Sequence, residues 1–167
     1  MYVDGEPNLV SRVIAQWEQQ DPTLDVSPIG VIGRVHSIAD WLSEQRVALY
    51  AKYALGTGEF DVLAALLRSG PPYEMTPSAL ADWTLVSSGA VTKRVDRCME
   101  QGWVTRRPGR GDGRSRVIAL TPEGKELIDV VWAASISRVH ELVSGLDLAE
   151  RDQLAMLLDK WSRSLGI

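Results

Sequence analysis

Eight basic side chains gather within a thirty-residue stretch of the sequence, residues 87–116. They are Lys93, Arg94, Arg97, Arg106, Arg107, Arg110, Arg114 and Arg116, and only the acids Asp96, Glu100 and Asp112 accompany them. The stretch carries a formal charge of +5, whereas the whole chain of 167 residues carries −4, which leaves −9 for the rest. A concentrated basic stretch on an acidic body attracts phosphate locally and repels it elsewhere, so this distribution favours a polyanionic partner.

The first half of this stretch, residues 87–101, is predicted to form a helix with two different faces. At 100° per residue one face carries the apolar side chains Val91, Val95, Cys98 and Met99. Lys93 and Arg97 point away from that face, and Ser88 and Thr92 flank them toward the N-terminal end. Small polar groups at a helix N-terminus, followed by long cations, are the layout of a helix that reads the major groove of DNA.

The second half of the stretch is predicted to form a β-hairpin over residues 103–107 and 117–120. A loop rich in glycine joins the two strands and carries Arg110, Arg114 and Arg116. Arginines at such a tip reach into a narrow minor groove, where the negative potential is strongest. Asp112 precedes Arg114 by two residues, and we expect its carboxylate to hold that guanidinium in place.

The rest of the chain shows helical periodicity almost throughout. Helices are predicted over residues 8–19, 60–67, 78–83, 121–144 and 147–164, together with a long one from residue 27 to just before residue 56. Asp147 and Glu150 have the spacing of a capping box at the start of the last helix. The predicted fold class is therefore mainly α with a small β-hairpin, the pattern of a winged helix-turn-helix.

Four segments of the sequence resemble the MarR family of winged-helix regulators: SSGAVTKRVDR (87–97), GWV (102–104), DGRS (112–115) and VIALTPEG (117–124). The resemblance implies a single chain over residues 1–167, with a DNA-binding lobe at 57–120 and dimerisation helices at 8–50 and 121–165. It also implies a homodimeric repressor of a pseudo-palindromic double-stranded operator. The expected DNA contacts are Thr76, Ser87, Ser88, Thr92, Lys93, Arg97, Arg110, Asp112, Arg114 and Arg116.

Four features in the first half of the sequence resemble a urate-responsive subgroup of that family. They are an N-terminal extension with Trp17, followed by LDVSP (24–28), FDVL (60–63) and GPPY (70–73). The resemblance implies that Trp17, Asp61, Arg94 and Arg106 bind a planar anion such as urate or an aromatic acid. In the alternative interpretation, Trp17 packs in the dimer core and Asp61 simply forms a salt bridge with Arg94.

Other classes of function have less support in the sequence. There is no Ser/His/acid set, phosphate loop or ligand-spaced metal cluster, so neither an enzyme nor a cofactor is predicted. No apolar run approaches the roughly 18 residues that span a bilayer, and a cytoplasmic location is expected. Two alternatives stay open: a winged-helix module that binds protein instead of DNA, and a redox sensor that uses Cys98.

Overall fold

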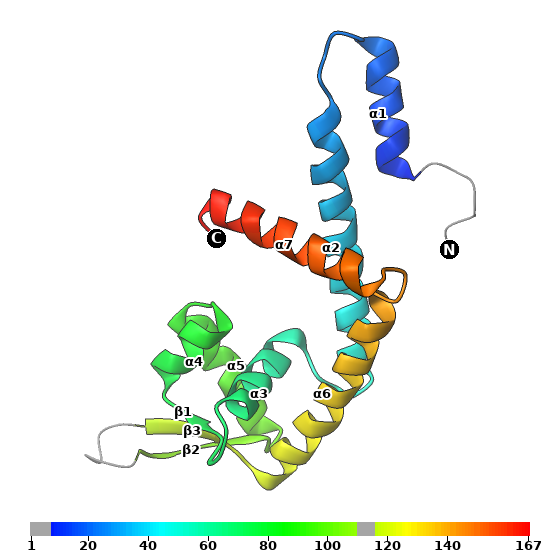
Figure 1. Ribbon diagram of the computed structural model, residues 1–167. Helices are drawn as coiled ribbons and strands as arrows, with labels where there is room; N and C mark the ends of the chain where they lie inside the picture. The colour runs from blue at the N-terminus through cyan, green and yellow to red at the C-terminus, as the bar shows by residue number, and fades with distance from the viewer. Residues whose placement is uncertain (1–7, 110–115) are drawn as a thin grey trace. The chain divides into compact units, whose positions relative to one another are not determined.

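The computed structural model describes residues 8–109 and 116–167 (Figure 1). The chain forms two compact units, which divide between Lys52 and Tyr53. The first unit ends at Lys52 and contains α1 (Leu9–Gln20) and α2 (Ser27–Ala51). Asn8 caps α1 by accepting a hydrogen bond from the Ser11 amide at 2.9 Å. Val10 of α1 packs directly on Gly33, where a Cβ atom would lie 3.0 Å from the valine. Glycine at this position therefore lets the two helices approach closely.

The second unit, Tyr53–Ile167, has the order of a winged helix-turn-helix. Its elements are α3 (Thr57–Arg68), β1 (Glu74–Met75), α4 (Pro77–Thr84), α5 (Ser88–Glu100), β2 (Val104–Pro108), β3 (Arg116–Leu120), α6 (Pro122–Leu142) and α7 (Leu148–Leu165). The predicted helices and the hairpin are all present, with boundaries that move by a few residues.

The sheet differs from the prediction because it has three strands instead of two. β3 lies between β1 and β2 and pairs antiparallel with both, with Glu74 opposite Ala119 and Thr105 also opposite Ala119 (Figure 1). β1 is only two residues long, which is too short to produce the alternating pattern that identifies a strand in a sequence.

Helix α3 forms the centre of the core, because it contacts α4, α5, α6 and β3. Its side chains Val62, Leu63 and Leu66 are fully buried. The helix begins at Thr57, three residues before the predicted start, since Gly56 adopts an extended conformation as its N-cap. This earlier start brings Glu59 into the first turn of the helix.

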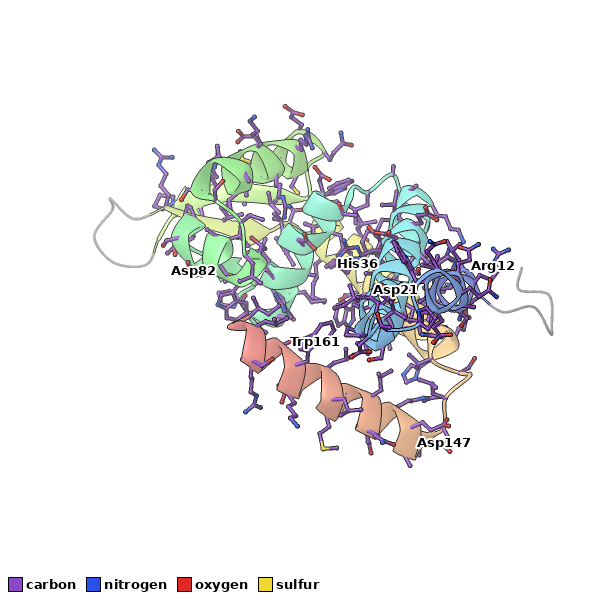
Figure 2. All side chains as sticks on the ribbon, turned by 90° about the horizontal axis from the view of Figure 1, so that it is seen from above. Arg12, Asp21, His36, Asp82, Asp147 and Trp161 are labelled. Atoms are coloured by element: carbon purple, nitrogen blue, oxygen red, sulfur yellow. The ribbon has the colours of Figure 1, made fainter. Side chains whose placement is uncertain are left out.

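The last two helices carry apolar side chains that the chain itself leaves exposed. They are Val130, Trp132, Ile136 and Val139 on α6, and Leu148, Leu154, Met156, Leu157, Leu158 and Leu165 on α7. The predicted capping box starts α7 at Asp147, which is labelled in Figure 2. The Asp147 amide donates to Glu150 Oε2 and the Glu150 amide donates to Asp147 Oδ1, both at 2.9 Å. Within the described residues, no helix is both long and apolar enough to cross a membrane.

Candidate nucleic-acid interface

Helix α5 has the buried and exposed faces that its periodicity predicts. Val91, Val95 and Cys98 are at most 2% exposed and pack against the rest of the lobe. Met99, which the sequence placed on the same face, is 37% exposed because it lies at the edge of that face. Lys93 on the opposite side and Thr92, which flanks the buried face, are open to solvent. The helix is therefore anchored along one face and free to meet a ligand along the other.

Three of the predicted DNA-contact hydroxyls also hold the helices in place. The Ser87 hydroxyl accepts a hydrogen bond from the Ala90 amide at 3.4 Å and caps α5. Thr76 caps α4 in the same way through the Ala79 amide, at 3.2 Å. The Thr92 hydroxyl donates to the Ser88 carbonyl at 3.1 Å. All of these residues are exposed, so their side chains remain accessible at the surface.

The basic side chains divide into two groups. Four of them form ion pairs: Arg94 with Asp61 at 3.0 Å, Arg97 with Glu59 at 3.3 Å, Arg106 with Asp96 at 2.8 Å, and Arg107 with Glu74. Lys93 and Arg116 are exposed and have no ion pair among the described residues. The predicted contacts Arg110, Asp112 and Arg114 lie outside the described residues.

Arg97 lies in a different direction from the one predicted. It follows Lys93 by four residues and is therefore about 40° further round the helix. That rotation takes it to the side of Arg94, where both arginines reach acids in the first two turns of α3. Only Lys93 of the predicted pair lies nearly opposite the buried face.

Two of the acids that pair with these cations, Glu59 and Glu74, were missed by sequence reasoning. Glu59 is 8% exposed in α3, and Glu74 is half-buried in the unpredicted strand β1. A signal was present for Glu59, because acids are favoured in the first turn of a helix. The predicted helix begins after it, at Phe60, so the prediction leaves Glu59 outside the helix.

The predicted effector residues are only partly brought together. Arg94 and Asp61 are in contact, with side chains 25% and 36% exposed. The stem of Arg94 crosses Gly58, where a Cβ atom would lie 2.8 Å from its Nε. Arg106 pairs instead with Asp96 on the other side of α5, and Trp17 belongs to the N-terminal unit. The ion pair of the alternative interpretation is thus present.

Cys98 lies in an environment that disfavours the reactive thiolate. Its side chain is fully buried, and burial together with the negative charge of Glu59 raises the pKa of the thiol to about 12. A reactive sensor cysteine needs a lowered pKa and access to solvent. The structure therefore argues against the redox alternative.

Comparisons with known proteins agree with this architecture. A model described as the MarR family matches residues 55–115. The HTH-type transcriptional regulator PecS of Dickeya dadantii is 34% identical over 156 residues, which cover 93% of this chain and 94% of PecS. These matched proteins are regulators and not enzymes, as the sequence predicts.

Solved structures share the fold at lower identity. A mutant MarR from E. coli complexed with operator DNA has a TM-score of 0.67 at 24% identity, covering 83% of this chain and 98% of that one. BpsR of Bordetella bronchiseptica, whose DNA binding is regulated by 6-hydroxynicotinic acid, has a TM-score of 0.61 at 22% identity, covering 77% and 98%. The chain belongs to the MarR family of winged helix-turn-helix transcriptional regulators.

Proposed function

We propose that this regulator is a repressor that binds a pseudo-palindromic operator as a homodimer and releases it when a small planar anion binds. The observation that carries the DNA contact is the N-terminal end of α5. Ser87, Ser88, Thr92 and Lys93 are exposed there, on a helix whose other face is anchored by Val91 and Val95. In this proposal the end of α5 enters the major groove, and the wing enters the minor groove through Arg110, Arg114 and Arg116.

The proposed dimer explains the exposed apolar side chains of α6 and α7. Isolated exposed apolar residues are common, but two helices with such residues along their lengths are typical of an interface. We assign the dimerisation surface to residues 8–50 and 121–165, and the DNA-binding lobe to residues 57–120. A twofold dimer presents two α5 helices to half-sites that lie one turn apart, roughly 34–36 Å.

The proposed effector site centres on the ion pair between Arg94 and Asp61. In the absence of ligand, Asp61 neutralises the guanidinium, which is partly removed from solvent. A planar anion, such as urate or an aromatic acid, would bind Arg94, and its charge would repel Asp61. Because Arg94 belongs to α5, breaking this pair would shift the recognition helix. The regulation of BpsR by an aromatic acid supports this class of effector.

The DNA-binding proposal is tested by selecting fragments from a random duplex library with the purified protein. We expect one enriched motif with two inverted half-sites, and an affinity that falls steeply with salt. A winged-helix module that binds protein would instead select no sequence and retain no duplex at physiological salt. That outcome would favour the alternative function.

The effector proposal is tested by calorimetry of the full chain with urate, xanthine and salicylate. We expect heat from at least one of them at up to millimolar ligand, and its loss in Arg94→Ala. Arg107→Ala provides a matched control, because it removes an arginine that also forms an ion pair in the second unit, with Glu74, and that is not one of the proposed effector residues. No heat from the wild-type protein would leave Asp61 and Arg94 with a structural role alone.

A further inference from the structure

Glu59 is held in one place by the start of α3. Its residue is 8% exposed, and it occupies the third position of the helix, where the dipole stabilises a negative charge. A Cβ atom on Gly56 would lie 2.1 Å from Glu59 Oε2, so the missing side chain at residue 56 leaves room for the carboxylate. The carboxylate is therefore a fixed point on α3.

Arg97 reaches this fixed point from α5. Its NH1 group donates a hydrogen bond of 3.3 Å to Glu59 Oε1, while its side chain remains 69% exposed. The pair joins residues 38 positions apart in the sequence and so connects the C-terminal half of α5 to α3. The charge pattern also assigns Arg97 to DNA phosphate. Glu59 and phosphate would therefore compete for the same guanidinium.

The balance between those partners favours Glu59. A contact of an exposed arginine with phosphate gains the release of about one counterion. If Arg97 left Glu59 for phosphate, the almost buried carboxylate of Glu59 would have no cation beside it, and an unpaired buried charge is strongly unfavourable. The pair is therefore expected to persist when DNA is bound.

The surroundings of Arg97 also disfavour phosphate. Arg97, Glu59, Glu100 and Trp103 line a hollow of about 350 Å³ on this side of the lobe. A second carboxylate in that lining, from Glu100, adds negative charge close to the guanidinium. The C-terminal half of α5 thus presents no net positive charge here, in contrast to Lys93 one turn earlier.

We propose that Glu59 is a positioning residue for DNA recognition. It holds Arg97 on the first turn of α3, and so fixes the angle at which α5 meets the groove; Arg97 is a structural tie, and Lys93 is the phosphate contact. The proposal rests on the proposed function of α5 as the recognition helix. It assigns to Arg97 a different role from that predicted by the charge pattern.

The test uses Glu59→Ala, Arg97→Ala and the double variant that combines these two changes. Lys93→Ala serves as the comparison, because it removes a cation that has no ion pair among the described residues. For each full-length protein, affinity is measured for the selected operator and for an unrelated duplex, over a range of salt concentrations. Arg97→Ala should lower operator affinity about tenfold and leave the affinity for unrelated duplex and the salt slope unchanged. Glu59→Ala should lower operator affinity by a similar factor, while its affinity for unrelated duplex rises up to about threefold at low salt because the Arg97 guanidinium is freed. The double variant should bind operator no worse than Arg97→Ala. Lys93→Ala should weaken both duplexes and reduce the salt slope by about 1.

Two further variants keep the proposal testable if the alanine variants fold poorly. Glu59→Gln retains an oxygen that accepts a hydrogen bond from Arg97, and Arg97→Lys retains the charge, so both should recover part of the operator affinity. A salt slope that falls by about 1 in Arg97→Ala, with equal losses on both duplexes, would show that Arg97 contacts phosphate and would overturn the proposal. Additive losses in the double variant would overturn it as well.

Failure of the proposed function would look different. In that case the wild-type protein would bind neither duplex, and Lys93→Ala would change nothing. The role of Glu59 in recognition would then be wrong too. Melting temperatures of the single and double variants would still report whether the two side chains are coupled.

Discussion

The two halves of the recognition helix differ in what their charged side chains do. The open end, residues 87–93, has exposed hydroxyls and Lys93, with no ion pair among the described residues. The tied half, residues 94–100, has Arg94, Asp96 and Arg97, and each of these pairs with a side chain from α3 or β2. Charge of the same sign therefore serves recognition at one end and placement at the other.

This difference shows that a count of basic residues overestimates the charge offered to DNA. The acids that neutralise Arg94, Arg97 and Arg107 come from residues 59, 61 and 74, which lie outside the basic stretch. The surface that remains for phosphate, among the described residues, is the open end of α5 and the root of the wing at Arg116. A small positive surface in a well-fixed orientation favours specificity over general attraction.

The largest expected effect is on stability, at the contact between α6 and the backbone that follows the tied half. A Cβ atom on the buried Gly124 of α6 would lie 1.9 Å from the backbone oxygen of Trp103, which leads into β2. Gly124→Ala should therefore destabilise the fold by about 3 kcal/mol, measured by urea denaturation. Gly89→Ala at the open end meets nothing within 4 Å and is the control. It should stabilise the protein by about 0.5–1 kcal/mol, and equal effects at both glycines would contradict the comparison.

The next effect separates the halves by adding the same charge to each. Ser88→Glu places a carboxylate at the open end, where it faces phosphate, and should weaken operator binding about a hundredfold. Gln101→Glu adds the same charge just after the tied half and should weaken binding less than about threefold. Fluorescence anisotropy with labelled operator measures both. Equal losses would mean that DNA approaches the whole length of α5.

A smaller effect is expected from freeing a tied cation. Glu74→Gln removes the acid that pairs with Arg107 on β2, whose side chain is 46% exposed. Since the charge left without a partner, Arg107, is largely exposed to solvent, stability should fall by less than about 1 kcal/mol. Affinity for unrelated duplex should rise about two- to threefold at low salt, because the released guanidinium attracts phosphate. Unchanged affinity, in a titration at low and high salt, would place Arg107 away from the DNA.

The sequence predicted those parts of the site that depend on local spacing. The buried face of α5 follows from the period of 3.6 residues, and the cap of α7 follows from Asp147 and Glu150 three residues apart. The family motif, which lies in the same local segments, identified the winged helix-turn-helix. These features depend on residues that are close in the sequence, so they can be predicted without a structure.

The ion pairs could not be predicted in the same way. Arg94 and Asp61 are 33 residues apart, and Arg97 and Glu59 are 38 apart. Whether such side chains meet depends on how α3 packs on α5, which no periodicity within either helix reveals. The pair of Arg94 with Asp61 is one of the two interpretations that the sequence leaves open, whereas Glu59 lies before the predicted start of α3. β1 was missed because two residues carry no pattern.

The smallest effect is expected at Cys98, which lies on the buried face of the tied half beside Glu59. Burial and the charge of Glu59 raise the pKa of its thiol to about 12, so at pH 8 only about one molecule in ten thousand carries the thiolate. The native protein should therefore not react with a disulfide reagent such as Ellman's reagent at pH 8 within an hour, whereas protein in urea should react at once. Hydrogen peroxide should likewise leave operator binding unchanged. Rapid labelling of the native protein would mean that the tied half opens readily, and Glu59→Ala would then be expected to label faster still, because both the tie and the neighbouring negative charge are lost.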